Sequence, residues 1–252
     1  MRHLSRALPL VILLAFSAAC SKSADTSTSA SASSQESPGA AASADQENAD
    51  FGLRLALLEG HLLVGRELIE ANQIDHALPH FGHPVRELYG DLRPVIDKRH
   101  GEQFQTDLVQ LEALAASQPR SPQFDAAFST ALTKAHAARD TIPEATRSSD
   151  AYVLHLMSDI ATTASQEYRN ALVAGKIGSL VEYHDARGFM TYALQVLHEH
   201  GPSTNAKIQK ATEIVTDLHT MVAPLNPPDP PLGTDAQFEA KAAELRALVA
   251  AP

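Results

Sequence analysis

The sequence predicts an all-α protein: tandemly duplicated antiparallel four-helix units that follow a disordered N-terminal tether. Apolar residues recur at three- and four-residue spacing along most of the chain, whereas strand-like alternation and clusters of β-branched residues are scarce. Breaks that contain glycine or proline divide this pattern into about eight segments. Features of the first half also recur in the same order in the second half.

Each predicted helix has an apolar face and ends where a residue type stops or starts helices for a backbone reason. Asn72, Gly101, Gly175 and Gly201 mark four of the breaks, and proline-containing stretches mark others. The predicted helices cover residues 50–71, 76–98, 104–117, 122–139, 149–174, 176–200, 203–223 and 234–249.

Local sequence matches predict that the last four helices repeat the first four. Turn residues match as well as helix residues, which favours a duplication over chance similarity between helices. We therefore predict a first four-helix unit at 49–145 and a second at 146–252. Whether the two units share one core is left open. The matches are residues 71–75 with 174–178, Arg66 with Arg169, Tyr89 with Tyr192, and 123–126 with 237–240.

Residues 1–20 have the pattern of a signal peptide. Arg2 and Arg6 precede an apolar run too short to span a bilayer, and small residues stand directly before Cys20. Cys20 is the only cysteine, and its surroundings resemble a bacterial lipobox, so we expect it to carry a lipid. The alternative is an ordinary cleaved signal with an incidental cysteine. By the same resemblance, Ser21 implies sorting to the outer membrane, on its periplasmic side.

Residues 21–48 are rich in Ser, Ala, Thr, Gln and Glu and contain almost no bulky apolar residue, which predicts a disordered linker. The net charge of the chain is −10, and removal of Arg2 and Arg6 with the signal lowers it to −12. An acidic surface repels nucleic acid and attracts cations or basic partners. We therefore expect no nucleic-acid binding.

The densest group of potential metal ligands is His76, His80, His83 and Glu87, spaced at i, i+4, i+7 and i+11. At 100° per residue these positions lie within about 60° of one another on an unbroken helix. His61, on the preceding helix, is the candidate for a further ligand. Imidazole and carboxylate ligands suit iron, zinc or copper, so the pattern predicts a transition-metal site.

Two prolines interrupt this histidine segment. Pro79 is harmless only in the first turn of a helix, and Pro84 deprives the His80 carbonyl of its usual partner. A kink at Pro84 could swing His76 and His80 away from His83 and Glu87. The alternative interpretation is therefore a set of solvated and hydrogen-bonded histidines.

Glu182, His184 and Asp185 stand close together in a later helix. Their side chains point in different directions there, which argues against joint ligation. No motif for a nucleophile elbow, phosphate-binding loop, zinc protease or haem attachment occurs. We expect no enzymatic activity.

Residues 82–90, Gly-His-Pro-Val-Arg-Glu-Leu-Tyr-Gly, resemble the Gly-Xaa-His-Xaa-Xaa-Glu signature of imelysin-like proteins. In that family the acidic residue follows the histidine by three positions, whereas Glu87 follows His83 by four. The resemblance implies an exported, duplicated helical bundle linked to iron uptake, with a role in iron binding for His83 and Glu87.

Two functions follow from these patterns. The first is an envelope-anchored lipoprotein that binds a transition-metal ion for uptake or homeostasis. The second is a non-catalytic helical adaptor or scaffold that binds another envelope protein. In both, the N-terminal lipid attaches the chain to the membrane.

Overall fold

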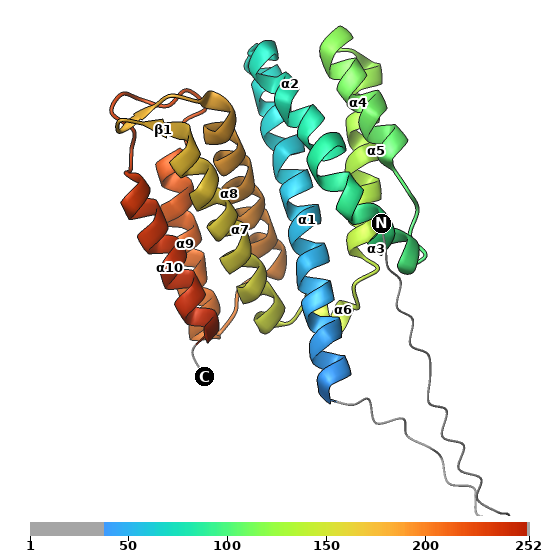
Figure 1. The fold of residues 1–252 in the computed structure, drawn as a ribbon, viewed down its shortest axis with the longest axis vertical. Helices are drawn as coiled ribbons and strands as arrows, with labels where there is room; N and C mark the ends of the chain where they lie inside the picture. Colours follow the sequence, from blue (N-terminus) through green and yellow to red (C-terminus); the bar gives the residue numbers. More distant parts are fainter. Residues whose placement is uncertain (1–37, 251–252) are drawn as a thin grey trace, which may run out of the picture. The chain divides into compact units, whose positions relative to one another are not determined.

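The computed structural model describes residues 38–250, which are almost entirely helical, as predicted (Figure 1). The predicted signal peptide, the lipid-attachment residue Cys20 and the linker up to residue 37 lie outside the described residues. Within the described part of the chain, no helix combines the length and the apolar character needed to cross a membrane.

The first helical group forms a four-helix arrangement. Its second helix is interrupted, so that α2, a π-helical turn η1 and α3 follow one another. Successive helices of the group pack together, and α5 packs back against α1. The elements are α1 (Pro38–Glu70), α2 (Ile74–His83), η1 (Pro84–Leu88), α3 (Tyr89–Lys98), α4 (Gln105–Ser117) and α5 (Pro122–Arg139).

The second helical group follows the short helix α6 (Glu144–Arg147). It repeats the same pattern of packing, since each helix contacts the next and α10 contacts α7. A two-residue antiparallel hairpin, β1 (Leu172–Val173) and β2 (Lys176–Ile177), joins its first two helices. The helices are α7 (Asp150–Ala171), α8 (Leu180–His200), α9 (Ala206–Val222) and α10 (Asp235–Ala250).

Each group encloses its own hydrophobic cluster. Phe81 and Phe124 lie in the first cluster, and Tyr168 and Phe238 lie in the second. Helices α1 and α8 pack against each other and so join the two groups (Figure 1). The partly buried side chain of Tyr152 packs against both clusters.

Two glycines allow α1 and α8 to approach closely. A Cβ atom on Gly188 would clash with the carbonyl oxygen of Gly60, and one on Gly60 would lie 2.8 Å from the ring of Phe189. Gly65 likewise lets α1 approach α2 closely, because a Cβ atom on Gly65 would lie 3.0 Å from the ring of Phe81. The backbone of α1 therefore contacts both α2 and α8 near His61.

The first helix begins earlier than expected. The prediction of disorder to residue 48 and of a helix from residue 50 is wrong for residues 38–48, because α1 starts at Pro38. Asn48 is buried and accepts a hydrogen bond from Arg99, and Glu47 forms an ion pair with Lys98. These tertiary contacts stabilise a stretch whose composition alone indicates a linker.

The predicted helix 149–174 ends at Ala171, because the chain then forms the β1–β2 hairpin. Ala174 and Gly175 both have positive φ, at 52° and 78°, as a two-residue hairpin turn requires. Asn72, which aligns with Gly175 in the two halves, also has a positive φ of 62°. The aligned turn residues therefore share a backbone conformation.

The predicted helix 76–98 is divided at Pro84. Pro79 lies inside α2 and not in its first turn. The backbone N–H of Tyr89 donates to the carbonyl of Pro84, the i to i+5 pattern of a π-helical turn. The expected displacement of His80 from His83 does not occur, because both belong to α2 and the interruption begins after them.

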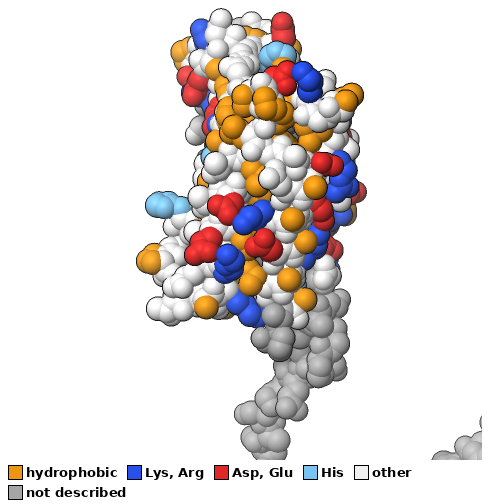
Figure 2. All heavy atoms as spheres, turned by 90° about the vertical axis from the view of Figure 1, so that its left-hand side faces the viewer, with side chains coloured by type: hydrophobic (Ala, Val, Ile, Leu, Met, Phe, Trp, Pro, Cys, Tyr) orange, Lys and Arg blue, Asp and Glu red, His pale blue; other side chains and the backbone are white. Residues whose placement is uncertain are grey.

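One face of the molecule is shown in Figure 2, where basic and acidic side chains lie next to one another. Ion pairs of this kind in the second group include Lys241 with Asp217 and Arg246 with Glu239. The net negative charge of the chain is therefore not spread as a uniform field over this face.

Candidate metal centre

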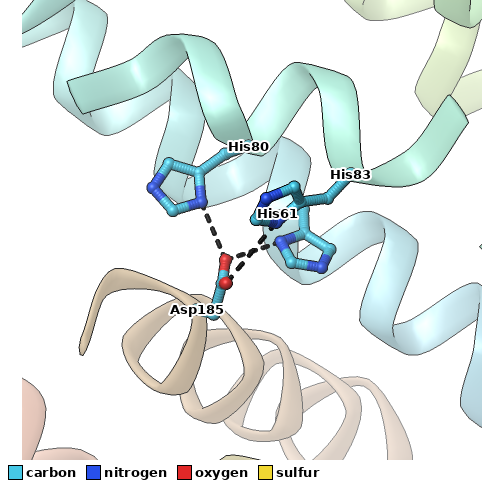
Figure 3. A group of neighbouring side chains, drawn as sticks. All are labelled: His61, His80, His83 and Asp185. Atoms are coloured by element: carbon cyan, nitrogen blue, oxygen red, sulfur yellow. Dashed lines mark hydrogen bonds and ion pairs between the residues drawn. The ribbon is translucent and has the colours of Figure 1, made fainter. Parts of the chain in front are cut away.

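Four side chains from three helices converge where the two helical groups meet (Figure 3). His61 comes from α1, His80 and His83 from α2, and Asp185 from α8. Each offers one potential ligand atom, and these atoms all lie within 4.8 Å of one another. We call this set the His/Asp cluster.

Local helix geometry places each member of the cluster. His80 and His83 are three residues apart in the last turn of α2, so both project from the same face. His61 follows Gly60, and Asp185 precedes Gly188 by one turn, so the close crossing of α1 and α8 brings these two side chains together. The cluster therefore depends on the two glycines as well as on its ligands.

The imidazoles all direct Nδ1 toward the carboxylate of Asp185. His61 Nδ1 lies 2.7 Å and His80 Nδ1 2.8 Å from Oδ1, while His83 Nδ1 lies 3.5 Å from Oδ2. Only His80 is aligned for a hydrogen bond; Nδ1 of His61 and of His83 has no partner with hydrogen-bond geometry among the described residues. Short contacts without pairwise alignment fit donors arranged around a common centre.

The cluster is largely shielded from solvent. The side chain of His80 is fully buried, those of His61 and Asp185 are 6% exposed, and that of His83 is 19% exposed. Burial alone would raise the pKa of Asp185, but the facing imidazoles of His61, His80 and His83 outweigh it and hold that pKa well below its usual range. The carboxylate is thus ionised at neutral pH.

The histidines differ in their protonation. Burial lowers the pKa of His80 despite its hydrogen bond to Asp185. The pKa of His83 is raised, because its interaction with Asp185 outweighs its smaller burial. A second carboxylate lies nearby on α7, where burial and then the charge of Asp185 raise the pKa of Glu167. The charge of Asp185 thus favours the neutral form of Glu167.

The donor set fits a transition-metal ion. Such ions bind imidazole nitrogen and carboxylate oxygen at about 2 Å, so donors on opposite sides of one ion are about 4 Å apart. Around a four-coordinate ion the donors are about 3.3 Å apart, so the widest separations, up to 4.8 Å, must contract and the contacts of 2.7 and 2.8 Å to Asp185 Oδ1 must lengthen. Three imidazoles and one carboxylate suit iron, zinc or copper better than magnesium or calcium, which prefer oxygen ligands.

Of the predicted site residues, the structure brings His61, His80 and His83 together but leaves His76 and Glu87 outside. His76 is exposed one turn before His80, and its ring centroid lies 6.3 Å from that of His184. Glu87 is 62% exposed and its Oε1 lies 3.8 Å from Nε2 of His83, the nitrogen that faces away from Asp185. The π-helical turn carries Glu87 off the face that bears the donors.

Asp185 was missed from the sequence, where only its joint ligation with Glu182 and His184 was considered. A signal was present: Asp185 lies on one helical face with Gly188, Phe189 and Tyr192, at i, i+3, i+4 and i+7. All four are buried. A carboxylate on an otherwise apolar helical face needs a partner, and here the partners are the histidines.

Comparison with known families finds a match in the second half of the chain. The model of the iron permease-associated 4-helix bundle domain matches residues 143–251. This part of the chain, which includes Asp185 but none of the three clustered histidines, is thus similar to a helical domain associated with iron permeases rather than to imelysin-like proteins in particular. No curated protein and no solved structure matches.

Proposed function

We propose that this protein binds one transition-metal ion, iron in its ferrous state, through His61, His80, His83 and Asp185. The observation that carries the proposal is the convergence of three Nδ1 atoms on a buried, ionised carboxylate. A buried charge needs compensation, and an ion bound by all four groups provides it. The similarity of residues 143–251 to an iron permease-associated domain favours iron.

For a site that binds iron, the donor set indicates the ferrous state. Imidazole ligands combined with a carboxylate are typical of non-haem Fe(II) sites as well as of zinc and copper sites. The general order of affinities places zinc and copper above Fe(II) for such ligands, so selection of iron depends on which ion is supplied. We propose a role in iron uptake or homeostasis and no catalytic role.

Glu87 fits a role outside the ligand set. When Nδ1 of His83 binds an ion, Nε2 of the same ring carries the proton. Oε1 of Glu87 lies 3.8 Å from this nitrogen and can accept a hydrogen bond from it after a small movement. His83 and Glu87 are the residues that resemble the imelysin signature. We propose that kinship with these iron-linked proteins extends to this pair, with His83 as ligand and Glu87 as its support.

We propose further that the protein is a lipoprotein, anchored through Cys20 to the outer membrane on its periplasmic side. The residues between Cys20 and α1 have the composition of a linker, which would give the helical body reach within the envelope. A second envelope protein, such as the membrane component that receives the ion, is the proposed partner.

The test is metal binding by the full-length chain purified in detergent. We expect one Zn(II), used as an air-stable probe, and one Fe(II) under anaerobic conditions, measured by isothermal titration calorimetry and elemental analysis. His83→Gln, at the most exposed ligand, lowers the affinity for both ions about tenfold or more, because one of four bonds is lost.

The matched control is His155→Gln, which removes an exposed imidazole of α7 that is not part of the cluster. It leaves affinity and stoichiometry unchanged. Absence of binding by the wild type, or equal affinities for the wild type and His83→Gln, contradicts the proposal and leaves the adaptor function in its place.

A further inference from the structure

A buried histidine next to the cluster has an unused nitrogen. His184 is 1% exposed, and its Nε2 lies 2.9 Å from the carbonyl oxygen of Leu225. A carbonyl oxygen only accepts hydrogen bonds, so Nε2 of His184 carries the proton and donates it. Nδ1 of His184 is then the acceptor nitrogen, and it is buried with no hydrogen-bond partner among the described residues.

His80 has an unused nitrogen for the same reason. Its Nδ1 donates to the ionised carboxylate of Asp185, so Nε2 has the free lone pair in the neutral ring. Nε2 of His80 is also buried without a partner in the described part of the chain. The centroids of the His80 and His184 rings are 5.7 Å apart, with 73° between the ring planes.

Each of the two neighbouring rings therefore holds a buried acceptor nitrogen, and no hydrogen bond joins the rings. Two lone pairs cannot bond to each other, and a buried polar atom without a partner is costly and needs an explanation. An ion in the His/Asp cluster removes the conflict. It takes the lone pair of His80 Nδ1, so the single proton of the neutral ring must then reside on Nε2.

We infer that His184 is a positioning residue for the bound ion, because Nε2 of His80 donates to Nδ1 of His184 when the ion occupies the cluster. This inference rests on the proposed function. The proton count does not change: His80 carries one proton on Nδ1 before binding and one on Nε2 afterwards. Asp185 exchanges a hydrogen-bond donor for the ion, and both unused nitrogens gain a partner.

The resulting chain runs from the ion through His80 and His184 to the carbonyl of Leu225. Ligating histidines generally donate their other ring N–H to such an outer acceptor, which fixes the tautomer and the orientation of the ring. Leu225 lies between α9 and α10, where the hydroxyl of Tyr183 also donates to the carbonyl of Pro224. Binding of an ion in the His/Asp cluster is thus linked, through these hydrogen bonds, to the loop between α9 and α10.

Two substitutions at residue 184 separate the acceptor role from simple filling of space. His184→Asn places an amide oxygen near the position of Nδ1 and keeps the acceptor for His80. His184→Gln keeps a donor for Leu225 but removes that acceptor. Loss of an outer partner typically lowers metal affinity about 10- to 100-fold. We expect this loss for His184→Gln and an affinity within about threefold of wild type for His184→Asn.

His76→Ala is the matched control, because it removes an exposed imidazole that neighbours His184 but has no place in the chain from the ion to Leu225. Its affinity stays at the wild-type value. Thermal denaturation of each metal-free variant verifies that it is folded before the affinities are compared.

The decisive experiment is nitrogen-15 NMR of the histidine rings of the full-length protein, before and after addition of Zn(II). We expect the ring proton of His80 to move from Nδ1 to Nε2 and to show coupling to Nδ1 of His184. Equal affinities for His184→Gln and the wild type, or a proton on Nε2 of His80 without coupling to Nδ1 of His184, overturns this inference alone. Zinc binding with the proton still on Nδ1 contradicts both this inference and the proposed ligand set, because a protonated Nδ1 cannot bind the ion. No zinc binding at all overturns the proposed function and this inference with it.

Discussion

The second helices of the two groups differ in a way that divides the candidate site between them. In the first group this helix is interrupted after His83 and carries two imidazoles of the cluster, His80 and His83. In the second group, α8 continues unbroken from Leu180 to His200 and carries the carboxylate of Asp185. At the offset that aligns the two halves, His80 corresponds to Tyr183 and Gly82 to Asp185. Neither half contains the complete set of donors.

This division explains the placement of the cluster. A helix in a four-helix unit usually buries one face, toward the core of its own unit. Helix α8 buries two faces, one in the second hydrophobic cluster and one against α1. Asp185 lies on the face toward α1. An ion bound there contacts both groups, so binding stabilises the packing of α1 and α2 against α8.

We expect the largest change in metal affinity when the second group loses the carboxylate of Asp185. Asp185→Asn keeps the shape of the side chain but removes the charge. We expect the affinity for Zn(II) to fall at least about 100-fold, equivalent to about 2.7 kcal/mol. Isothermal titration measures this change.

The control is Asp159→Asn, at a partly buried carboxylate of α7 outside the cluster. If Asp159→Asn weakens zinc binding as much as Asp185→Asn does, general acidity and not the cluster explains the binding.

The next effect is that of pH on the imidazoles of the first group. The pKa of His83 is raised above its usual value by Asp185, so its nitrogen is protonated at mildly acidic pH and must lose the proton to bind an ion. The pKa of Asp185 is so low that this group stays ionised. Below the raised pKa of His83, the affinity should fall about tenfold per pH unit for one displaced proton.

Titrations of Zn(II) between neutral pH and mildly acidic pH test this dependence. In His83→Gln the slope becomes shallower, because the proton that competes with the ion is gone. An affinity that rises as the pH falls contradicts the ligand set.

A smaller effect tests how the two groups approach each other. Gly188→Ala introduces a methyl group that clashes with the carbonyl of Gly60, so the free energy of unfolding should fall by about 1–3 kcal/mol. The helices must also separate, which moves Asp185 away from His61 and weakens zinc binding severalfold. Urea denaturation and calorimetry measure the two changes.

Gly90→Ala in α3 is the matched variant, since a Cβ atom there meets nothing within 4 Å. It leaves zinc binding unchanged and stabilises the protein slightly, because alanine favours the helix. Equal effects of the two substitutions would show that the contact between α1 and α8 does not position the site.

The smallest effects concern the two predicted ligands that the structure leaves outside the cluster. His76→Ala and Glu87→Gln should each change the affinity for Zn(II) by less than about threefold, with Glu87→Gln the larger because of its place beside His83. A loss from His76→Ala as large as that from His83→Gln would show that α2 presents its histidines as the sequence alone predicts.

The sequence predicts the helices and most of their ends well, because their periodicity and their capping residues are local. It also predicts that His61, on the helix before the histidine segment, joins His80 and His83. It does not predict the π-helical turn, which absorbs the interruption by Pro84 after His83 instead of before it.

The sequence fails to identify Asp185 for a different reason. The residues of the second half that align with His76, His80, His83 and Glu87 are not metal ligands; they are Ser179, Tyr183, Ala186 and Met190. Asp185 meets the histidines only through the crossing of α1 and α8 at Gly60 and Gly188. The buried face of α8 that carries Asp185 shows that this carboxylate needs a partner, but its spacing does not show that the partners lie on α1 and α2.

The most direct measurement of the central claim is the X-ray absorption spectrum of the Zn(II)-loaded protein at the zinc edge. The account predicts one ion per chain with three imidazole nitrogens and one carboxylate oxygen at about 2.0–2.1 Å. Asp185→Asn then disrupts this environment. A spectrum dominated by water oxygens, or one that the substitution leaves unchanged, would contradict a metal centre formed jointly by the two helical groups.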